Sequence, residues 1–123
     1  LLGQRVQTTI SNAATSSVLG PYSQQLVGAL RQVAAATQAA WSTGEPSDAL
    51  ANAVPYMQAF GHTVLAWMWL EVALDSEGEG AANAGRRAAA QFFFHYELPK
   101  IGAWLNVVES RDMTCAQLSE DAF

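Results

Sequence analysis

The stretch that decides the fold reads DALANAVPYMQAFGHTVLAWMWL and spans residues 48–70. It carries no charged side chain after Asp48, and its apolar residues recur every three or four positions, which is the spacing of one side of an α-helix. The spacing predicts one broad inward face, made of Leu50, Ala53, Val54, Met57, Phe60, Val64, Trp67, Met68 and Val72.

This stretch is long enough to cross a bilayer. Four of its polar or helix-breaking residues gather on one side of the helix, where lipid would disfavour them: Asn52, Pro55, His62 and Thr63. We therefore predict a helix of a bundle, over residues 47–75, and no membrane span. Proline lacks an amide hydrogen and crowds the carbonyl four residues before it. A kink is therefore predicted at Pro55, with a break as the alternative.

The rest of the chain predicts more helices and no strands. No segment alternates apolar and polar residues, and Gly and Pro fall at the edges of segments. We predict an all-α fold, an up-and-down antiparallel four-helix bundle over residues 1–109, with helices at about 2–16, 21–42, 47–75 and 81–109. Pro99 is expected to bend the last helix, and residues 110–123 form a C-terminal tail that frays or docks.

Composition limits the classes of function. The chain has 123 residues, half of them hydrophobic and 14% charged, against roughly 25% charged in an average domain, so it is not intrinsically disordered. A net charge of −5, with no basic cluster larger than Arg86–Arg87, argues against nucleic acid and anionic membranes. The single Cys115 cannot form an internal disulfide, which favours a cytoplasmic location. The chain opens on Leu1 without an initiator Met, and we expect it to be a piece of a longer polypeptide.

Two histidines are the first candidate site. His62 and His95 are equally far along the chain from the turn at residues 76–80, so an antiparallel hairpin would place them at the same level. His95 is predicted to face inward with Ala84, Ala88, Phe92 and Ala103, whereas His62 lies on the polar side of its helix. A metal would need at least a third ligand. Hydrogen-bonded structural histidines are the favoured reading, ahead of a metal site or contacts to a ligand.

Glu71 and Arg86 are the second candidate pair. By the same counting they lie level across the turn, which predicts an ion pair between the two helices. Arg86 is expected to face outward with Arg87, Gln91 and Glu97. Without a partner, a buried Glu71 would have a raised pKa and could act as a base, but no nucleophile or phosphate-binding loop accompanies it.

Aromatic residues make a third candidate feature. Phe92, Phe93 and Phe94 cannot all face one core, because neighbours in a helix point about 100° apart. Phe94 falls among polar residues, and Trp69 and Leu70 fall outside the main apolar stripe of their helix. These side chains are expected either to pack within the bundle or to form a surface that another domain or subunit covers.

The stretch at residues 48–70 and the segment RAAAQFFFHYELP at residues 87–99 together resemble the C-terminal helical domain of the larger bacterial acyl-CoA dehydrogenases. The resemblance is most specific around Phe60-Gly61-His62, and among these enzymes it is greatest to the methylmercaptopropionyl-CoA dehydrogenase type. It implies a parent flavoenzyme whose other domains bind FAD and the acyl-CoA and carry the glutamate base.

The resemblance assigns no catalytic, flavin-binding or metal residue to this chain. It implies a noncatalytic domain that packs on the catalytic domains of the same polypeptide or supports a homo-oligomer. Two other functions stay open: a self-contained helical dimerisation module, and a small carrier of apolar ligands that uses the space near His62, His95 and Trp67.

Overall fold

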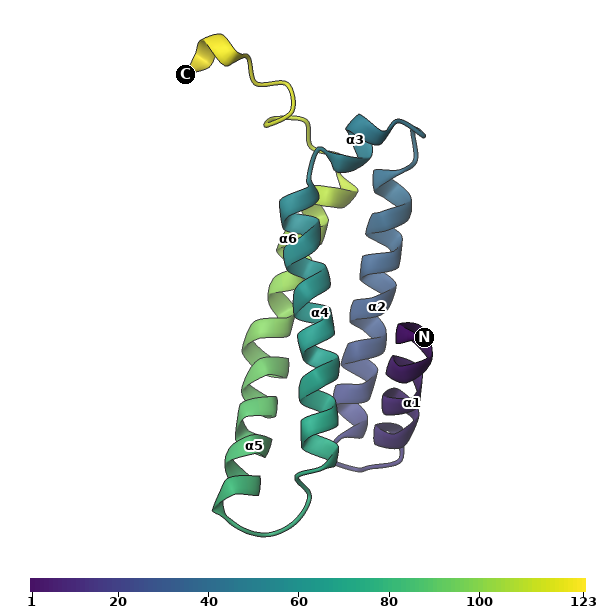
Figure 1. The fold of residues 1–123 in the computed structure, drawn as a ribbon, viewed down its shortest axis with the longest axis vertical. Helices are drawn as coiled ribbons and strands as arrows, with labels where there is room; N and C mark the ends of the chain where they lie inside the picture. Colours follow the sequence, from purple (N-terminus) through teal and green to yellow (C-terminus); the bar gives the residue numbers. More distant parts are fainter.

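The computed structural model describes residues 1–123 as a set of helices without β-strands (Figure 1). The α-helices are α1 (Leu2–Ala14), α2 (Gly20–Ala40), α3 (Pro46–Leu50), α4 (Ala53–Leu74), α5 (Ala81–Phe92) and α6 (Ile101–Glu109). A π-helical turn, Phe93–Glu97, and a 3₁₀ turn, Leu98–Lys100, join α5 to α6. These four elements form one continuous rod over residues 81–109, called the last rod below. The predicted all-α class is confirmed.

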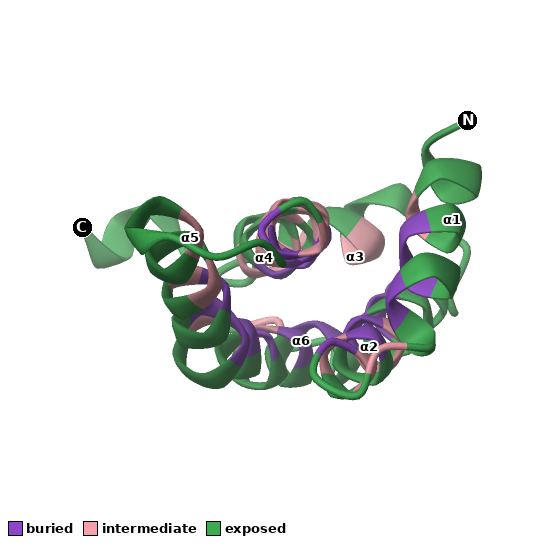
Figure 2. Cartoon of the chain, turned by 90° about the horizontal axis from the view of Figure 1, so that it is seen from below, coloured by how far each residue is buried: buried purple, intermediate pink, exposed green.

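Three long elements, α2, α4 and the last rod, pack against one another and alternate in direction (Figure 1). The shorter α1 packs on α2 and α4, is tilted relative to both, and lies on the opposite side of α4 from α5 (Figure 2). The predicted up-and-down bundle of four helices is not confirmed, because α1 does not pack against the last rod as the fourth helix of such a bundle would. No helix combines the length and the apolarity needed to cross a bilayer.

Small side chains fill much of the core. Each of the three long elements and α1 contributes an alanine that is almost fully buried, and the set comprises Ala13, Ala36, Ala59, Ala66, Ala73 and Ala90. Short side chains let helix axes approach closely, so the few large buried residues decide the packing. Those residues include Leu26, Leu70 and Phe94. The prediction that Leu70 lies outside the main stripe of its helix is therefore wrong.

The chain breaks between α3 and α4 instead of kinking at Pro55. Ala51 and Asn52 form a turn, and Asn52 has a non-helical backbone with φ −120° and ψ 41°. Pro55 then falls in the first turn of α4, where backbone amides have no partner within the helix and a missing N–H costs nothing. The Asn52 side chain donates to the carbonyl of Asp112 (2.8 Å), which ties the start of the tail to this break. The rest of the tail extends away from the bundle (Figure 1).

The last rod accommodates Pro99 by changing its helical type. The amide of Leu98 donates to the carbonyl of Phe93, five residues back, and Pro99 follows in the 3₁₀ turn.

The buried side of α5 also differs from the prediction, since Ala84, Ala88 and Phe92 are exposed while Ala90 is buried. Before Phe92, α5 carries no large apolar residue that marks its buried side, so the sequence pattern left that side undetermined.

Candidate functional site

Helix α4 is apolar on two opposite sides. Its buried side carries Ala59, Thr63, Ala66, Trp67, Leu70 and Ala73. The opposite side carries Val54, Met57, Gly61, Leu65 and Met68, and we call these five residues the outer face of α4. Val54 is 71% exposed and Met57 59% exposed, while Leu65 and Met68 are about half exposed. The inward positions predicted for Val54, Met57 and Met68 are therefore wrong.

The outer face continues across the break onto α3 and the end of α2. Leu50 is 62% exposed, contrary to the inward position predicted for it, and Trp41 is about half exposed. Together with Met57 and Tyr56 they line an apolar depression of about 200 Å³ between α2, α3 and the start of α4. Monomeric soluble proteins rarely expose contiguous apolar patches larger than a few hundred Å². This surface is therefore the strongest candidate for a contact with another protein surface.

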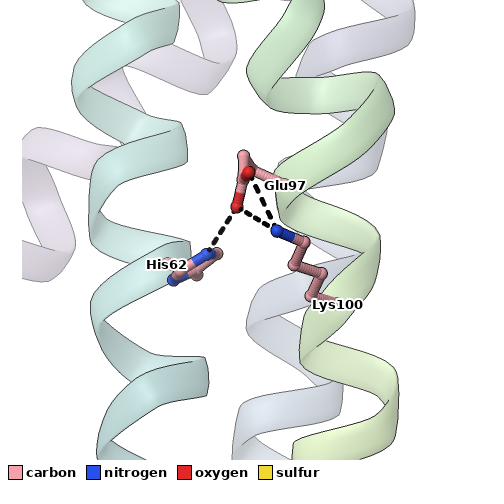
Figure 3. A network of polar contacts seen from close by, with 3 residues as sticks. All are labelled: His62, Glu97 and Lys100. Carbon is pink, nitrogen blue, oxygen red and sulfur yellow. Dashed lines mark hydrogen bonds and ion pairs between the residues drawn. The ribbon is translucent and has the colours of Figure 1, made fainter.

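A polar cluster lies between α4 and the last rod (Figure 3). His62 Nε2 lies 3.2 Å from Glu97 Oε2, and Lys100 Nζ donates to both carboxylate oxygens of Glu97 at 2.9 Å. With Glu97 ionised, Nε2 of His62 is the donor. The hydrogen bond from Lys100, followed by the one from His62, holds the pKa of Glu97 below its ordinary value. Sequence reasoning placed Glu97 outward and missed this cluster, although Glu97 and Lys100 have the i, i+3 spacing of a helical ion pair.

His62, on α4, contacts side chains of the last rod. Its ring lies 4.8 Å from the ring of Trp104, in an edge-on arrangement, and 5.6 Å from that of Phe93. Its contacts are thus two aromatic rings and one carboxylate, which suit a side chain that fixes α4 against the π-helical turn. His62 is hydrogen-bonded to Glu97, and its structural role stays a prediction.

His95 lies elsewhere. It is exposed, contrary to the inward position predicted for it, and its ring is 6.1 Å from the ring of Tyr22 on α2. The two histidines are therefore not brought together. No group of three His, Cys, Asp or Glu side chains is placed to bind one metal ion.

The predicted ion pair between Glu71 and Arg86 is not formed. Glu71 Oε1 accepts a hydrogen bond from Thr9 Oγ1 on α1 (2.9 Å), and Arg86 donates to Asn83 on its own helix. Arg87, which was predicted to face outward, donates instead to the carbonyls of Ser76 and Gly78. Arg87 therefore binds the loop between α4 and α5, and its predicted outward position is wrong.

Phe94 and Trp69 pack within the bundle, and two other aromatic side chains are exposed. Phe94 is 1% exposed and stacks on Tyr22 with a centroid distance of 4.7 Å, and Trp69 is partly buried against the core. Phe92 and Tyr96 are exposed instead and stack on each other at 5.1 Å. Of the two alternatives given for Phe94 and Trp69, packing within the bundle therefore applies to both, because the last rod turns Phe94 toward α2.

The polar cluster predicts a pH-dependent loss of stability. Because the pKa of Glu97 is lower in the folded state than the ordinary 4.5, ionised Glu97 stabilises the fold above that pH, and the stabilisation disappears as pH falls through the folded-state pKa. We expect Glu97→Gln to lower Tm modestly at pH 7 and to have a diminishing effect below pH 4.5. Thermal unfolding from pH 7 to pH 3 measures the difference.

Glu109→Gln is the matched control, since Glu109 is exposed at the end of α6 and forms no ion pair. It removes the same charge without disturbing His62 or Lys100. A Tm difference between wild type and Glu97→Gln that stays constant down to pH 3 would contradict the assigned role of the cluster.

Comparison with known proteins assigns the chain to a family. Residues 2–119 match the family model described as "Acetyl-CoA dehydrogenase C-terminal like", a span that includes all six α-helices. No curated protein and no solved structure matches the chain. It is accordingly the C-terminal domain of an acyl-CoA dehydrogenase-like protein, and it belongs to the acetyl-CoA dehydrogenase C-terminal-like family.

Proposed function

We propose that the chain is a noncatalytic domain of an FAD-dependent acyl-CoA dehydrogenase, of the methylmercaptopropionyl-CoA dehydrogenase type. The parent enzyme, in the cytoplasm, oxidises acyl-CoA thioesters to 2,3-enoyl-CoA. The domain packs through the outer face of α4 against the catalytic domains of the same polypeptide. The observation that carries this proposal is that α4 has no charged side chain from Ala53 to Leu70 and is buried on one side only.

A helix that is apolar on two opposite sides buries both only where a second surface covers the side that its own bundle leaves exposed. In a domain of a larger polypeptide, the neighbouring domains are present at a high effective concentration, which favours them over a separate partner as the cover of this face. The exposed side chains of the outer face, Trp41 and Leu50 then become part of an interface whose centre is free of charge, as in well-packed interfaces.

The residues of this chain do not fit a flavin. The apolar cavity between α1, α2 and α4 measures about 180 Å³ and has no charged side chain in its lining. Pockets that hold small-molecule ligands and cofactors measure roughly 300–1,000 Å³. The clefts that are larger in volume are shallow and open. FAD and the base that removes the substrate proton are therefore assigned to the other domains of the parent, and no catalytic step to this chain.

Methionine oxidation tests the packing. The outer face contains Met57 and Met68, and the third methionine, Met113, lies in the tail. Exposed thioethers oxidise readily, and burial protects them. We expect peroxide to oxidise Met57 and Met68 at least tenfold more slowly in the parent polypeptide than in the 123-residue chain, as measured by mass spectrometry of peptides, with the rate at Met113 changing much less.

Two variants give the control. Leu65→Glu places a charge in the middle of the outer face and should remove the protection in the parent, whereas Val107→Glu places it at another partly exposed apolar position, on α6, and should not. Equal oxidation rates of Met57 and Met68 in the parent and in the isolated chain would contradict the proposal.

A specific feature favours homodimerisation as the second candidate. The outer face has the spacing 54–57–61–65–68, which is symmetric about Gly61. Two copies crossing antiparallel at Gly61 would bring Val54 against Met68, and Met57 against Leu65, of the other copy, and no side chain at Gly61 would hold the helices apart. Light scattering of the isolated chain tests this: a dimer that Leu65→Glu dissociates supports it, and a monomer at all concentrations rejects it.

A further inference from the structure

A cavity lies where α1, α2 and α4 meet, away from the outer face of α4. It measures about 180 Å³, and its walls are mainly apolar, with Val6, Leu26, Leu30, Val33, Val64 and Trp67 as the principal contributors. None of its lining residues belongs to the outer face of α4 or to the polar cluster of His62, Glu97 and Lys100. Neither the proposed packing role nor the polar cluster accounts for this cavity.

The way α1 is held explains why the space is open. The second half of α1 is fixed, because Thr9 bonds to Glu71 and Trp67, and Ser23 on α2 donates to the carbonyl of Ile10 at 3.0 Å. The first half forms no hydrogen bond to another helix; its Arg5 guanidinium lies 5.8 Å from the centre of the Trp67 ring, and Leu2 at the rim is about half exposed. Gly3 lines the space with no side chain to fill it.

The polar groups near the cavity are already occupied. The hydroxyl of Thr63 donates to the carbonyl of Ala59 within α4, and the indole N–H of Trp67 donates to Thr9. No charged side chain lines the cavity, and Gln7 is exposed at its edge. A buried water needs two to four polar partners. The interior offers an apolar molecule good contacts and offers water few hydrogen bonds.

We propose that this cavity binds the end of an aliphatic chain. An engineered apolar cavity of about 150 Å³ holds one benzene molecule, so a space of about 180 Å³ accepts roughly six carbon atoms. The cavity is only partly enclosed, and Leu2, Leu30 and Phe60 at its rim are all partly exposed. A chain can thus enter with its polar head group left in solvent. This inference is independent of how the domain packs in its parent.

The probes are benzene, which reports the apolar volume, and 1-hexanol, which reports a chain with a polar head. Each is titrated into the ¹⁵N-labelled 123-residue chain while amide chemical shifts are recorded. We expect saturable shifts with both probes, concentrated at residues 2–7 and around Val33 and Val64. Both probes should also raise Tm, because they bind the folded state only.

Val64→Phe fills the cavity and should lower the affinity for both probes at least tenfold. Val107→Phe makes the same change on α6, away from the cavity, and should leave their affinities unchanged. If Val64→Phe does not fold, Leu30→Trp closes the mouth from a partly exposed position and takes its place. Non-saturable shifts, shifts that persist unchanged in the filled or closed variant, or binding of benzene without 1-hexanol would each overturn the proposal.

Discussion

Replacing Phe94 by alanine is expected to lower the free energy of unfolding by about 3–5 kcal/mol, the range typical of a buried Phe→Ala change. Phe94 is the largest of the side chains that are almost fully buried, and its ring stacks on Tyr22, so truncation leaves a cavity between α2 and the last rod. Phe92→Ala, two residues earlier, should cost less than about 1 kcal/mol because Phe92 is 53% exposed.

Urea unfolding followed by circular dichroism measures both variants. Equal slopes with different midpoints would show that stability alone has changed. Domains of this size have about 5–15 kcal/mol in total, so Phe94→Leu provides a milder variant if Phe94→Ala does not fold. A loss for Phe92→Ala that equals or exceeds the loss for Phe94→Ala would mean that the last rod turns its other side toward α2.

These two phenylalanines also show where sequence reasoning stops. The alanine-rich run before them predicts a helix, which the structure has, and at Pro99, where a bend was predicted, the helix changes type. Three consecutive phenylalanines leave the inward side ambiguous, and a π-helical turn changes the angle between successive residues at that point. Phe94 and His95 were therefore assigned to the wrong sides, although the helix itself was predicted.

The same limit applies to α4. Its existence follows from periodicity and from its lack of charge, whereas its buried side depends on which apolar stripe finds a partner. Leu70 is fully buried and Met57 is exposed, although both are apolar. The sequence of one domain contains no information about a second surface that covers the outer face. The sequence could predict that some apolar surface stays exposed, but it could not predict which residues form that surface.

Thr9→Val is expected to lower the free energy of unfolding by about 1–3 kcal/mol, the cost of leaving buried polar groups without partners. Thr9 is 3% exposed, and its hydroxyl accepts from Trp67 Nε1 at 2.8 Å. The same hydroxyl lies 2.9 Å from Glu71 Oε1 and 3.0 Å from the carbonyl of Arg5, and its single proton serves one of these at a time. Valine keeps the shape of threonine and removes these contacts.

Thr8→Val is the matched control. Thr8 is exposed and bonds only to the carbonyl of Gln4 on its own helix, so the change in helix propensity is the same and no buried partner is lost. It should alter the free energy of unfolding by no more than about 0.5 kcal/mol. Equal effects of the two substitutions would show that the buried network contributes nothing beyond propensity.

Combining Thr9→Val with Trp67→Phe identifies the group responsible. Phenylalanine has no indole N–H to leave unpaired, so Thr9→Val should cost less in that background than in the wild type. Residues in one hydrogen-bond network typically show coupling energies of about 0.5–3 kcal/mol in such cycles. Thr9, Trp67 and Glu71 form the side-chain hydrogen bonds between α1 and α4. Strictly additive costs would therefore mean that the hydrogen bond between Trp67 and Thr9 contributes nothing to stability.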